Sequence, residues 1–283
     1  MALKVTGQGA AVHESVFRWP VFEGTRQDLS TFAEGVRELC DGLTNDIEAV
    51  GVAVPATVDR SGTVVTWPGR PGWAGFDLAG SLGGLFPGIP VRYADDGDLA
   101  ALAEAHEAGV RDLVHLGVGT GIGGGIVLDG RLCPGSGRGS CEAGHMIVDR
   151  AGPECDCGRH GCLQAVASGP ATLRRAAALC GRDVSFTELR AALVHGRPWA
   201  ADALEESCAA LAAAAVSLAE LVHPDRITIG GGFAAGLPDF VERVRRHAQR
   251  LVRPGGAPVV LADAALGGLS SLQGAVLLAR EPV

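Results

Sequence analysis

Three predicted strands, each followed directly by aspartate or glycine, constrain the fold more than any other feature of this chain. Residues 91–94, 112–118 and 226–229 are predicted strands. Open α/β sheets bind their ligands at the carboxyl ends of such strands. We therefore expect an α/β protein whose functional residues lie on the turns that follow, which are Asp95-Asp96-Gly97-Asp98, Gly119-Thr120-Gly121-Ile122-Gly123-Gly124-Gly125 and Gly230-Gly231-Gly232.

Segments with helical spacing alternate with the predicted strands. The Ala- and Leu-rich segment 200–222 predicts one long helix that ends before Pro224. The alternation suggests two α/β halves. The other predicted helices are 27–43, 75–86, 99–108, 170–181, 185–194, 238–251 and 270–280, and the other predicted strands are 3–6, 10–19, 49–55, 64–67, 124–128 and 259–261.

Composition excludes several classes of protein. The chain has 283 residues and a formal net charge of −8, and a nucleic-acid surface would need a basic stripe instead. It contains no apolar run of the length that a membrane span requires, and its first residues lack the apolar core of a signal peptide. We expect a cytoplasmic protein, in which the eight cysteines are thiols or metal ligands rather than disulfides.

A cysteine cluster indicates a metal site. Cys155, Cys157 and Cys162 can supply three thiolate ligands, and structural zinc takes four Cys or His ligands. The fourth ligand is His145 or His160 on these grounds alone. Four protein ligands would leave no open position for water, so a zinc hydrolase is not expected.

The glycine run 119–125 is suited to phosphate. It lacks the Gly-Lys-Ser/Thr end of a Walker loop, and it leads into a strand rather than into the helix of a dinucleotide fingerprint. Its backbone amides and the Thr120 hydroxyl could still cradle a phosphate. The structural alternative is a glycine-rich hairpin without a ligand.

Acidic residues supply candidates for proton transfer. Asp95, Asp96 and Asp98 follow a predicted strand, and phosphorylation of an alcohol needs a base for the hydroxyl proton. The alternative for each is a helix cap or first-turn acid. Glu142 and His145 could bind vicinal hydroxyls of a sugar, although a lone Glu142 would more often be a solvated surface acid.

Together these motifs resemble the ROK family, which groups sugar kinases with sugar-responsive repressors. The likeness covers about residues 3–278 and rests chiefly on Glu142-x-Gly144-His145 followed by the cysteine cluster. It implies an α/β, two-domain, actin-like fold of the ribonuclease-H type with an interdomain cleft. The implied domains are residues 1–111 with 268–283, and residues 112–267 with the zinc loop.

The resemblance also implies roles for individual residues. Asp96 would be the catalytic base, and Mg-ATP and structural zinc would be the cofactors of a homodimer. Nucleotide would be bound by Gly119, Thr120, Gly121, Gly123, Gly124, Gly230, Gly231 and Gly232; substrate by Asp95, Glu142, His145 and Gln164; and zinc by His145, Cys155, Cys157 and Cys162.

Three departures from the family pattern bear on function. The Asp-x-Gly-Gly-Thr phosphate loop of family kinases is not found, so either the start lies upstream or this protein lacks that loop. Asp95 stands where the family has Asn, and Gln164 stands where the family has Glu. Because both positions touch sugar hydroxyls in relatives, we expect an amino sugar or a cyclitol rather than plain glucose, with Asp95 paired to an ammonium group.

The leading hypothesis is therefore an ATP-dependent kinase that phosphorylates a primary hydroxyl of a hexose, amino sugar or cyclitol. A non-catalytic sugar sensor of the same fold is the alternative, because of the phosphate loop that is not found. A repressor is not expected, because the acidic chain starts directly in predicted strands. The expected partners are a sugar-like substrate, a nucleotide and a second copy of the chain, without nucleic acid or membrane.

Overall fold

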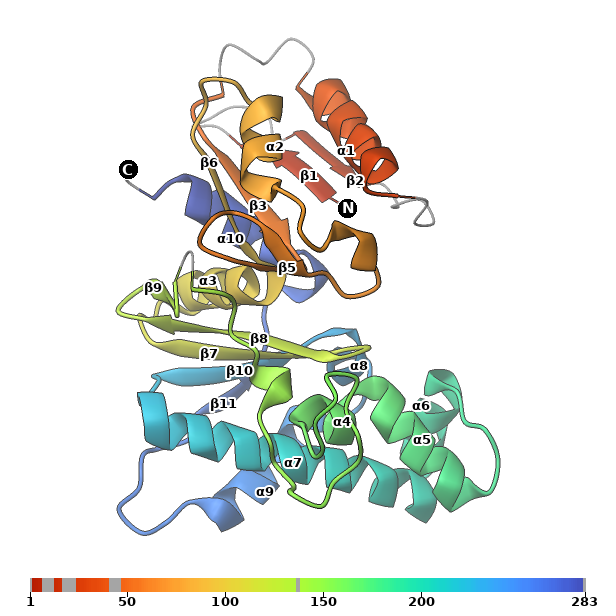
Figure 1. Cartoon of the computed structure of the whole chain (residues 1–283). Coiled ribbons are helices and arrows are strands. Elements are labelled where there is room, and N and C mark those ends of the chain that lie inside the picture. Colours follow the sequence, from red (N-terminus) through yellow and green to blue (C-terminus); the bar gives the residue numbers. More distant parts are fainter. Residues whose placement is uncertain (1, 7–12, 17–23, 41–46, 136–137, 282–283) are drawn as a thin grey trace. The chain divides into compact units, whose positions relative to one another are not determined.

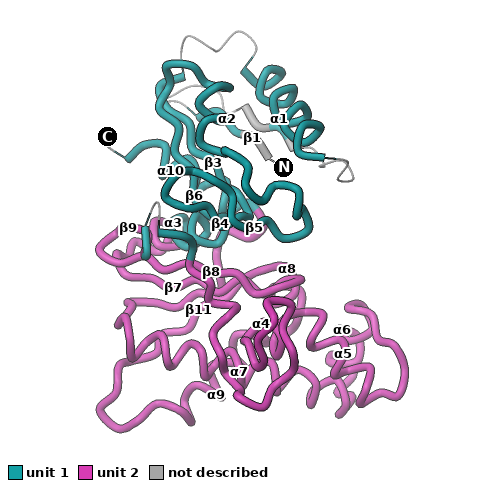
Figure 2. Tube along the Cα trace, in the orientation of Figure 1, with its two compact units in different colours: residues 1–103, 134–140, 269–283 teal, residues 104–133, 141–268 magenta. Residues whose placement is uncertain are grey.

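The computed structural model describes residues 2–6, 13–16, 24–40, 47–135 and 138–281 of the chain (Figure 1). They form two compact units, each of which is assembled from separate stretches of sequence (Figure 2). Unit 1 comprises Met1–Ala103, Pro134–Ser140 and Leu269–Val283, and unit 2 comprises Glu104–Cys133 and Cys141–Gly268. Both units mix helices and strands, as the sequence predicts.

Unit 2 is built on a five-stranded sheet with the order β11-β10-β7-β8-β9. Strand β10 (Arg226–Gly230) runs parallel to its neighbours β7 (Leu113–Val118) and β11 (Leu261–Asp263). Strands β7, β8 (Ile122–Leu128) and β9 (Arg131–Cys133) continue as antiparallel hairpins. This order brings the carboxyl ends of β7 and β10 next to each other at one edge of the sheet.

Helices complete unit 2. The long helix α7 (Pro198–Val222) begins with proline in its first turn and packs beside α9 (Phe240–Leu251). Ala203, Leu204 and Leu211 of α7 are fully buried. The small alanine side chains let neighbouring helices approach closely. The other helices are α4 (Leu163–Ala167), α5 (Gly169–Cys180), α6 (Phe186–Val194) and α8 (Gly232–Ala235), with the 3₁₀ turns η2 (Ala143–His145) and η3 (Gly267–Leu269).

Unit 1 contains the parallel pair β3 (Val50–Val54) and β6 (Val91–Asp95), on which α10 (Ser270–Ala279) packs. The approach is close, because a Cβ atom at Gly51 would lie 1.8 Å from the carbonyl oxygen of Ala275. The remaining elements are β1 (Ala2–Val5) and β2 (His13–Val16), which pair antiparallel, β4 (Thr57–Val58) and β5 (Val64–Thr66), which also pair antiparallel, and α1 (Thr25–Leu39), η1 (Pro71–Trp73) and α2 (Leu78–Leu85). Helix α3 (Asp96–Ala108) starts in unit 1 and ends in unit 2.

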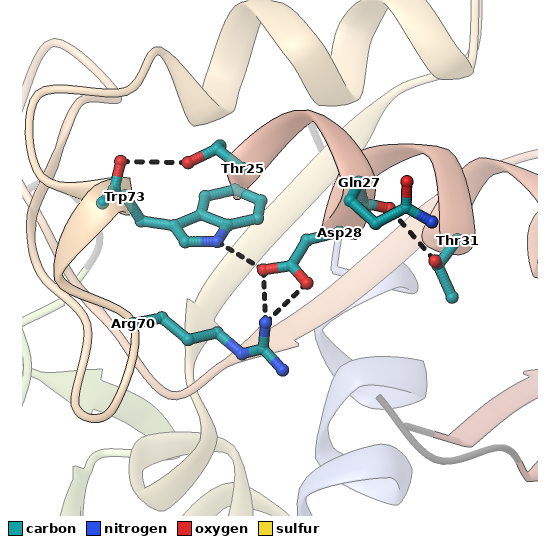
Figure 3. Close-up of polar contacts among 7 residues, drawn as sticks. Thr25, Gln27, Asp28, Thr31, Arg70 and Trp73 are labelled. Atoms are coloured by element: carbon teal, nitrogen blue, oxygen red, sulfur yellow. Dashed lines mark hydrogen bonds and ion pairs between the residues drawn. The ribbon is translucent and has the colours of Figure 1, made fainter. Parts of the chain in front are cut away.

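A buried carboxylate fastens the loop after β5 to helix α1. Asp28 is fully buried, and it accepts a hydrogen bond from the indole of Trp73 and forms an ion pair with Arg70 (Figure 3). The Thr25 hydroxyl donates to the carbonyl oxygen of Gly72 at 2.9 Å. Trp73 also stacks on Trp67, with 4.5 Å between ring centroids. The loop is therefore held by charge, hydrogen bonds and aromatic packing together.

Most predicted elements are confirmed, with shifts of a few residues at their ends. The predicted strands 3–6 and 10–19 correspond to β1 and β2, although residues 7–12 and 17–19 lie outside the described part of the chain. The predicted helix 27–43 is α1, which ends at Leu39, and residues 41–43 again lie outside the description. None of the described helices combines the length and the apolar character that crossing a lipid bilayer requires.

Candidate functional site

Asp95 and Asp96 lie where β6 meets α3. Strand β6 ends at Asp95, which pairs in register with Val54 of β3, and α3 begins at Asp96. Both residues therefore occupy the carboxyl edge of the parallel pair, as predicted. The Gly97 amide donates a 2.9 Å hydrogen bond to Oδ1 of Asp95, which makes Asp95 the N-cap of α3. The structural alternative considered for these acids thus holds for Asp95, without removing its charge.

Asp96 has the electrostatics of a proton acceptor. Its side chain is exposed, whereas Asp98 is buried. Desolvation by the surrounding protein raises the pKa of the Asp96 carboxyl, and hydrogen bonds from the backbone amides of Gly97 and of Asp96 itself partly offset the rise. A carboxylate with a raised pKa binds a proton more readily than an ordinary surface aspartate does. Asp96 is thus suited to receive the proton of an alcohol.

The glycine run that follows β7 forms a tight hairpin turn. The amide of Gly119 donates to the carbonyl oxygen of Gly121 at 2.9 Å, and Val118 pairs with Ile122 across the hairpin. The sequence analysis expected a glycine loop over 119–125 with a strand from 124, and β8 already begins two residues earlier, at Ile122. Gly124 is buried, and a Cβ atom there would lie 2.5 Å from the backbone of β7. Position 124 therefore requires glycine for close packing against β7, and the turn itself comprises residues 119–121.

The second glycine turn lies against the first. Gly230 ends β10, and Gly232 begins α8. Gly231 has a φ of +86°, and a Cβ atom there would lie 2.4 Å from the carbonyl oxygen of Val118. The backbone of residues 230–232 therefore touches the end of β7, directly before the 119–121 turn. The two turns predicted to bind the nucleotide are neighbours in unit 2.

The predicted sugar-binding residues of unit 2 lie beside the 119–121 turn. Glu142 precedes η2 and is exposed, and a Cβ atom at Gly144 would lie 1.9 Å from the carbonyl oxygen of Ile122. Gln164 lies in the first turn of α4. A Cβ atom added at Gly121 or at Gly144 would lie 3.3 Å from its Oε1. The structure thus brings together these residues and the glycine turns, whereas Asp95 and Asp96 belong to unit 1.

His145, Cys155, Cys157 and Cys162 form a candidate metal centre. Their potential ligand atoms all lie within 4.8 Å of one another. Nδ1 of His145 is 3.7 Å from Sγ of Cys155, and the sulfurs of Cys157 and Cys162 are 3.6 Å apart. Tetrahedral zinc with Zn–S bonds of about 2.3 Å places two sulfurs about 3.8 Å apart. The donor set and its spacing therefore fit zinc, and the competing candidate His160 is exposed and lies outside this described group.

The thiols of the centre differ in their surroundings. A side-chain hydrogen bond with Arg159, together with its backbone, lowers the pKa of Cys157 to about 6. Burial raises the pKa of Cys162 to about 12. A bound divalent metal favours the thiolate at every ligand and would override this difference. The two thiols therefore release their protons to an incoming metal with unequal ease.

Three buried polar residues of unit 2, His115, Thr228 and Glu104, were not found by sequence reasoning. His115 of β7 pairs in register with Thr228 of β10, and its Nδ1 is 3.0 Å from the threonine hydroxyl. Burial lowers the pKa of His115, which favours the neutral imidazole, and the charge of Glu104 partly opposes this. Glu104 is also buried and accepts 2.9 Å hydrogen bonds from the amides of Ala265 and Leu266. Polar residues at matching positions of two apolar strands were the available signal.

Comparison with known proteins agrees with this arrangement. The chain belongs to the ROK family, whose model matches residues 19–282. It is 54% identical to the kanosamine kinase of Amycolatopsis mediterranei, over 99% of this chain and 92% of the relative.

Solved structures are similar as well. A ROK hexokinase from Thermus thermophilus has a TM-score of 0.85 at 32% identity, over 96% of this chain and 92% of the other. A ROK family glucokinase from Streptomyces griseus, solved with glucose and AMPPNP, has a TM-score of 0.76 at 27% identity and the same coverage. The predicted family and the actin-like α/β fold are confirmed, and the comparisons support a sugar phosphotransferase as the function class.

Proposed function

We propose that this protein is a Mg-ATP-dependent kinase that phosphorylates a primary hydroxyl of an amino sugar. The observation that carries the proposal is the identity of 54% with a kanosamine kinase over 99% of the chain. An acidic residue at position 95 supports it independently, because a carboxylate can pair with a sugar ammonium group. The Gly97 amide donates the cap hydrogen bond to Oδ1 of Asp95.

Asp96 is the proposed catalytic base. Its carboxylate takes the proton of the substrate hydroxyl as that oxygen forms a bond to the γ-phosphorus, and the bond to the β-phosphate oxygen breaks to release ADP. The raised pKa of Asp96 favours this uptake. Glu142 and the Nε2 side of His145 are proposed to bind sugar hydroxyls, since Nδ1 of His145 faces the metal centre. Gln164 borders the same turn.

The glycine turns of unit 2 are the proposed nucleotide site. Backbone amides of residues 119–121 and the exposed Thr120 can donate to phosphate oxygens, and residues 230–232 lie beside them. Magnesium, when bound with the nucleotide, supplies charge neutralisation at the phosphates. Zinc at the four-residue centre has a structural role in this proposal, because it fixes the loop that presents Glu142 and His145.

An assay of ADP release with saturating Mg-ATP tests the function. We expect kanosamine to be phosphorylated with a higher kcat/KM than glucose or N-acetylmannosamine, because only kanosamine carries an ammonium group. Phosphorus NMR of the product would assign the hydroxyl that is modified. If calorimetry shows that a sugar binds but no sugar of the panel causes ADP release, the proposal of a kinase is wrong and the non-catalytic sugar sensor remains.

A homodimer and a cytoplasmic location are also proposed. The homodimer is inferred from the resemblance to the ROK family, and the cytoplasmic location is inferred from the sequence. ATP, the proposed second substrate, is present in the cytoplasm. Light scattering after size-exclusion chromatography tests the dimer, which should have about twice the chain mass of 28.9 kDa.

A further inference from the structure

The side chain of Gln164 lies between the metal centre and two glycines, Gly121 of the 119–121 turn and Gly144 of η2. Its Nε2 donates to Sγ of Cys155 at 3.6 Å. Its Oε1, at the other end of the same amide, is 3.3 Å from the Cβ positions of Gly121 and Gly144. Gln164 follows the predicted metal ligand Cys162 by two residues, so it is carried on the first turn of the helix that begins at the centre.

The chemistry of the sulfur determines which way the amide faces. A metal-bound cysteine is a thiolate, which accepts hydrogen bonds and cannot donate them. The NH₂ end of Gln164 must therefore face Cys155, and the carbonyl end must face Gly121 and Gly144. Because Cys155 is only 4% exposed, water has little access to its sulfur, and a protein donor matters more there.

The helix that carries Gln164 is itself held firmly. The Leu163 amide donates to the carbonyl oxygen of Met146 at 2.7 Å. At the other end of α4, Nη2 of Arg175 donates to the carbonyl oxygen of Val166 at 2.7 Å. Because the backbone of α4 is fixed at both ends, a change in the position of the Cys155 sulfur can alter the position of the Gln164 side chain beside the 119–121 turn.

We propose that Gln164 is a positioning residue that couples the metal centre to the turn at residues 119–121, by donating a hydrogen bond to the Cys155 thiolate. Glutamine suits this place because its amide can donate to the thiolate, whereas the ionised glutamate of the family pattern has no proton to donate. The role is compatible with a sugar contact, since a carbonyl oxygen accepts two hydrogen bonds. It depends on the metal centre and does not depend on the identity of the substrate.

Zinc affinity of the full chain, measured by competition with a chelator in the absence of sugar and nucleotide, is the first test. Gln164→Met keeps the length and removes the donor, and Gln164→Glu also adds charge. Loss of a hydrogen bond to a metal ligand typically weakens binding about 10–100-fold. We expect a loss of zinc affinity at the low end of this range for Gln164→Met and a similar loss for Gln164→Glu, because both variants remove the donor. Gln249→Glu, which makes the same charge change on the exposed side of α9, is the control and should not alter affinity.

The cobalt-substituted protein gives a readout that a general loss of packing would not mimic. The thiolate-to-cobalt absorption should shift in both Gln164 variants, because the sulfur loses a hydrogen-bond donor, and stay unchanged in Gln249→Glu. Hydrogen exchange of the peptide that contains residues 119–122 should become faster in zinc-loaded Gln164→Met, while peptides of α9 should not change. Wild-type zinc affinity, cobalt spectrum and exchange in both Gln164 variants would overturn the proposal. Wild-type exchange at 119–122 in a variant with weakened zinc binding would overturn the coupling to the turn.

Discussion

The carboxylate of Asp28 accepts a 2.9 Å hydrogen bond from the indole Nε1 of Trp73, while it also pairs with Arg70. Asp28 is fully buried and the Arg70 side chain is 14% exposed, so removal of one partner leaves the other charge poorly solvated. We expect Asp28→Ala to lower the free energy of unfolding by about 3 kcal/mol in urea titrations. The exposed Asp202→Ala should change it by less than about 0.5 kcal/mol. Equal effects of the two variants would contradict this interpretation of the loop.

Asp96 predicts the acid side of the pH–rate profile. The proposed base must be deprotonated to act, and desolvation by the surrounding protein raises its pKa, so kcat should fall with decreasing pH at a point above the ordinary aspartate pKa of about 3.9. Asp96→Asn should lower kcat by about 10²–10⁴-fold and leave sugar affinity largely intact. Steady-state kinetics from pH 4 to 9 and calorimetry of the variant provide the check. An Asp96→Asn enzyme that retains its kcat would rule out this base.

Asp95 predicts substrate preference. Asparagine is as good an N-cap as aspartate, so Asp95→Asn keeps the start of α3 and removes only the charge. If Asp95 pairs with the ammonium group, kcat/KM for kanosamine should fall by about 10–100-fold, and kcat/KM for glucose should stay the same or rise. The ratio of the two values, measured with one enzyme preparation, is insensitive to the active fraction. A parallel loss for both sugars would count against the ammonium contact.

Two glycines of the metal loop form a matched pair. Gly158 and Gly161 both have positive φ, so alanine is strained at either. A Cβ atom at Gly158 would meet no atom within 4 Å, whereas one at Gly161 would lie 1.5 Å from the carbonyl oxygen of Asp149. We expect Gly158→Ala to cost about 1 kcal/mol and to keep zinc, and Gly161→Ala to lose zinc. Zinc analysis by mass spectrometry and thermal melts separate the two; retention of zinc by both would contradict the close approach.

Removal of a metal ligand should destabilise unit 2. Cys155→Ser should reduce the content from about one zinc per chain and lower the apparent Tm by about 5 °C or more, because metal binding adds to folding stability. Cys180→Ser, outside the group, should retain the metal. A chelator should reproduce the Cys155→Ser melt in the wild type. If wild type and Cys155→Ser melt together after full zinc loading, the centre does not stabilise the fold.

Local pattern was sufficient to predict most of the fold. Strand β10 reads as Arg-Ile-Thr-Ile-Gly and helix α7 as an Ala- and Leu-rich run, and both were found within two residues of their observed ends. The short helices α4 and α8 were missed, because five and four residues carry no helical period. The start of β8 was predicted two residues late, since Ile122 and Gly123 lie in a glycine-rich run and only their pairing with β7 makes them strand.

Site residues on consecutive stretches were easier to predict than contacts across the sheet. The four predicted zinc ligands come together because spacing brings the cysteines near one another and the bridge between Ile147 and Cys162 aligns the His145 segment. In contrast, the His115–Thr228 pair depends on which strands are neighbours, and the Asp28–Arg70 pair joins positions 42 residues apart. No periodicity in a single sequence encodes such pairings.

The absence of a side chain at Gly144 ties the path of the chain between Glu142 and His145 to the hairpin of β7 and β8. The backbone there rests on the carbonyl oxygen of Ile122, and His145, the next residue, faces Cys155. The chain that presents Glu142 thus cannot be redrawn without moving the hairpin that it touches. Exchange of the side chains at 95, 142 and 164, which we propose contact the sugar, would alter recognition while leaving this backbone contact in place.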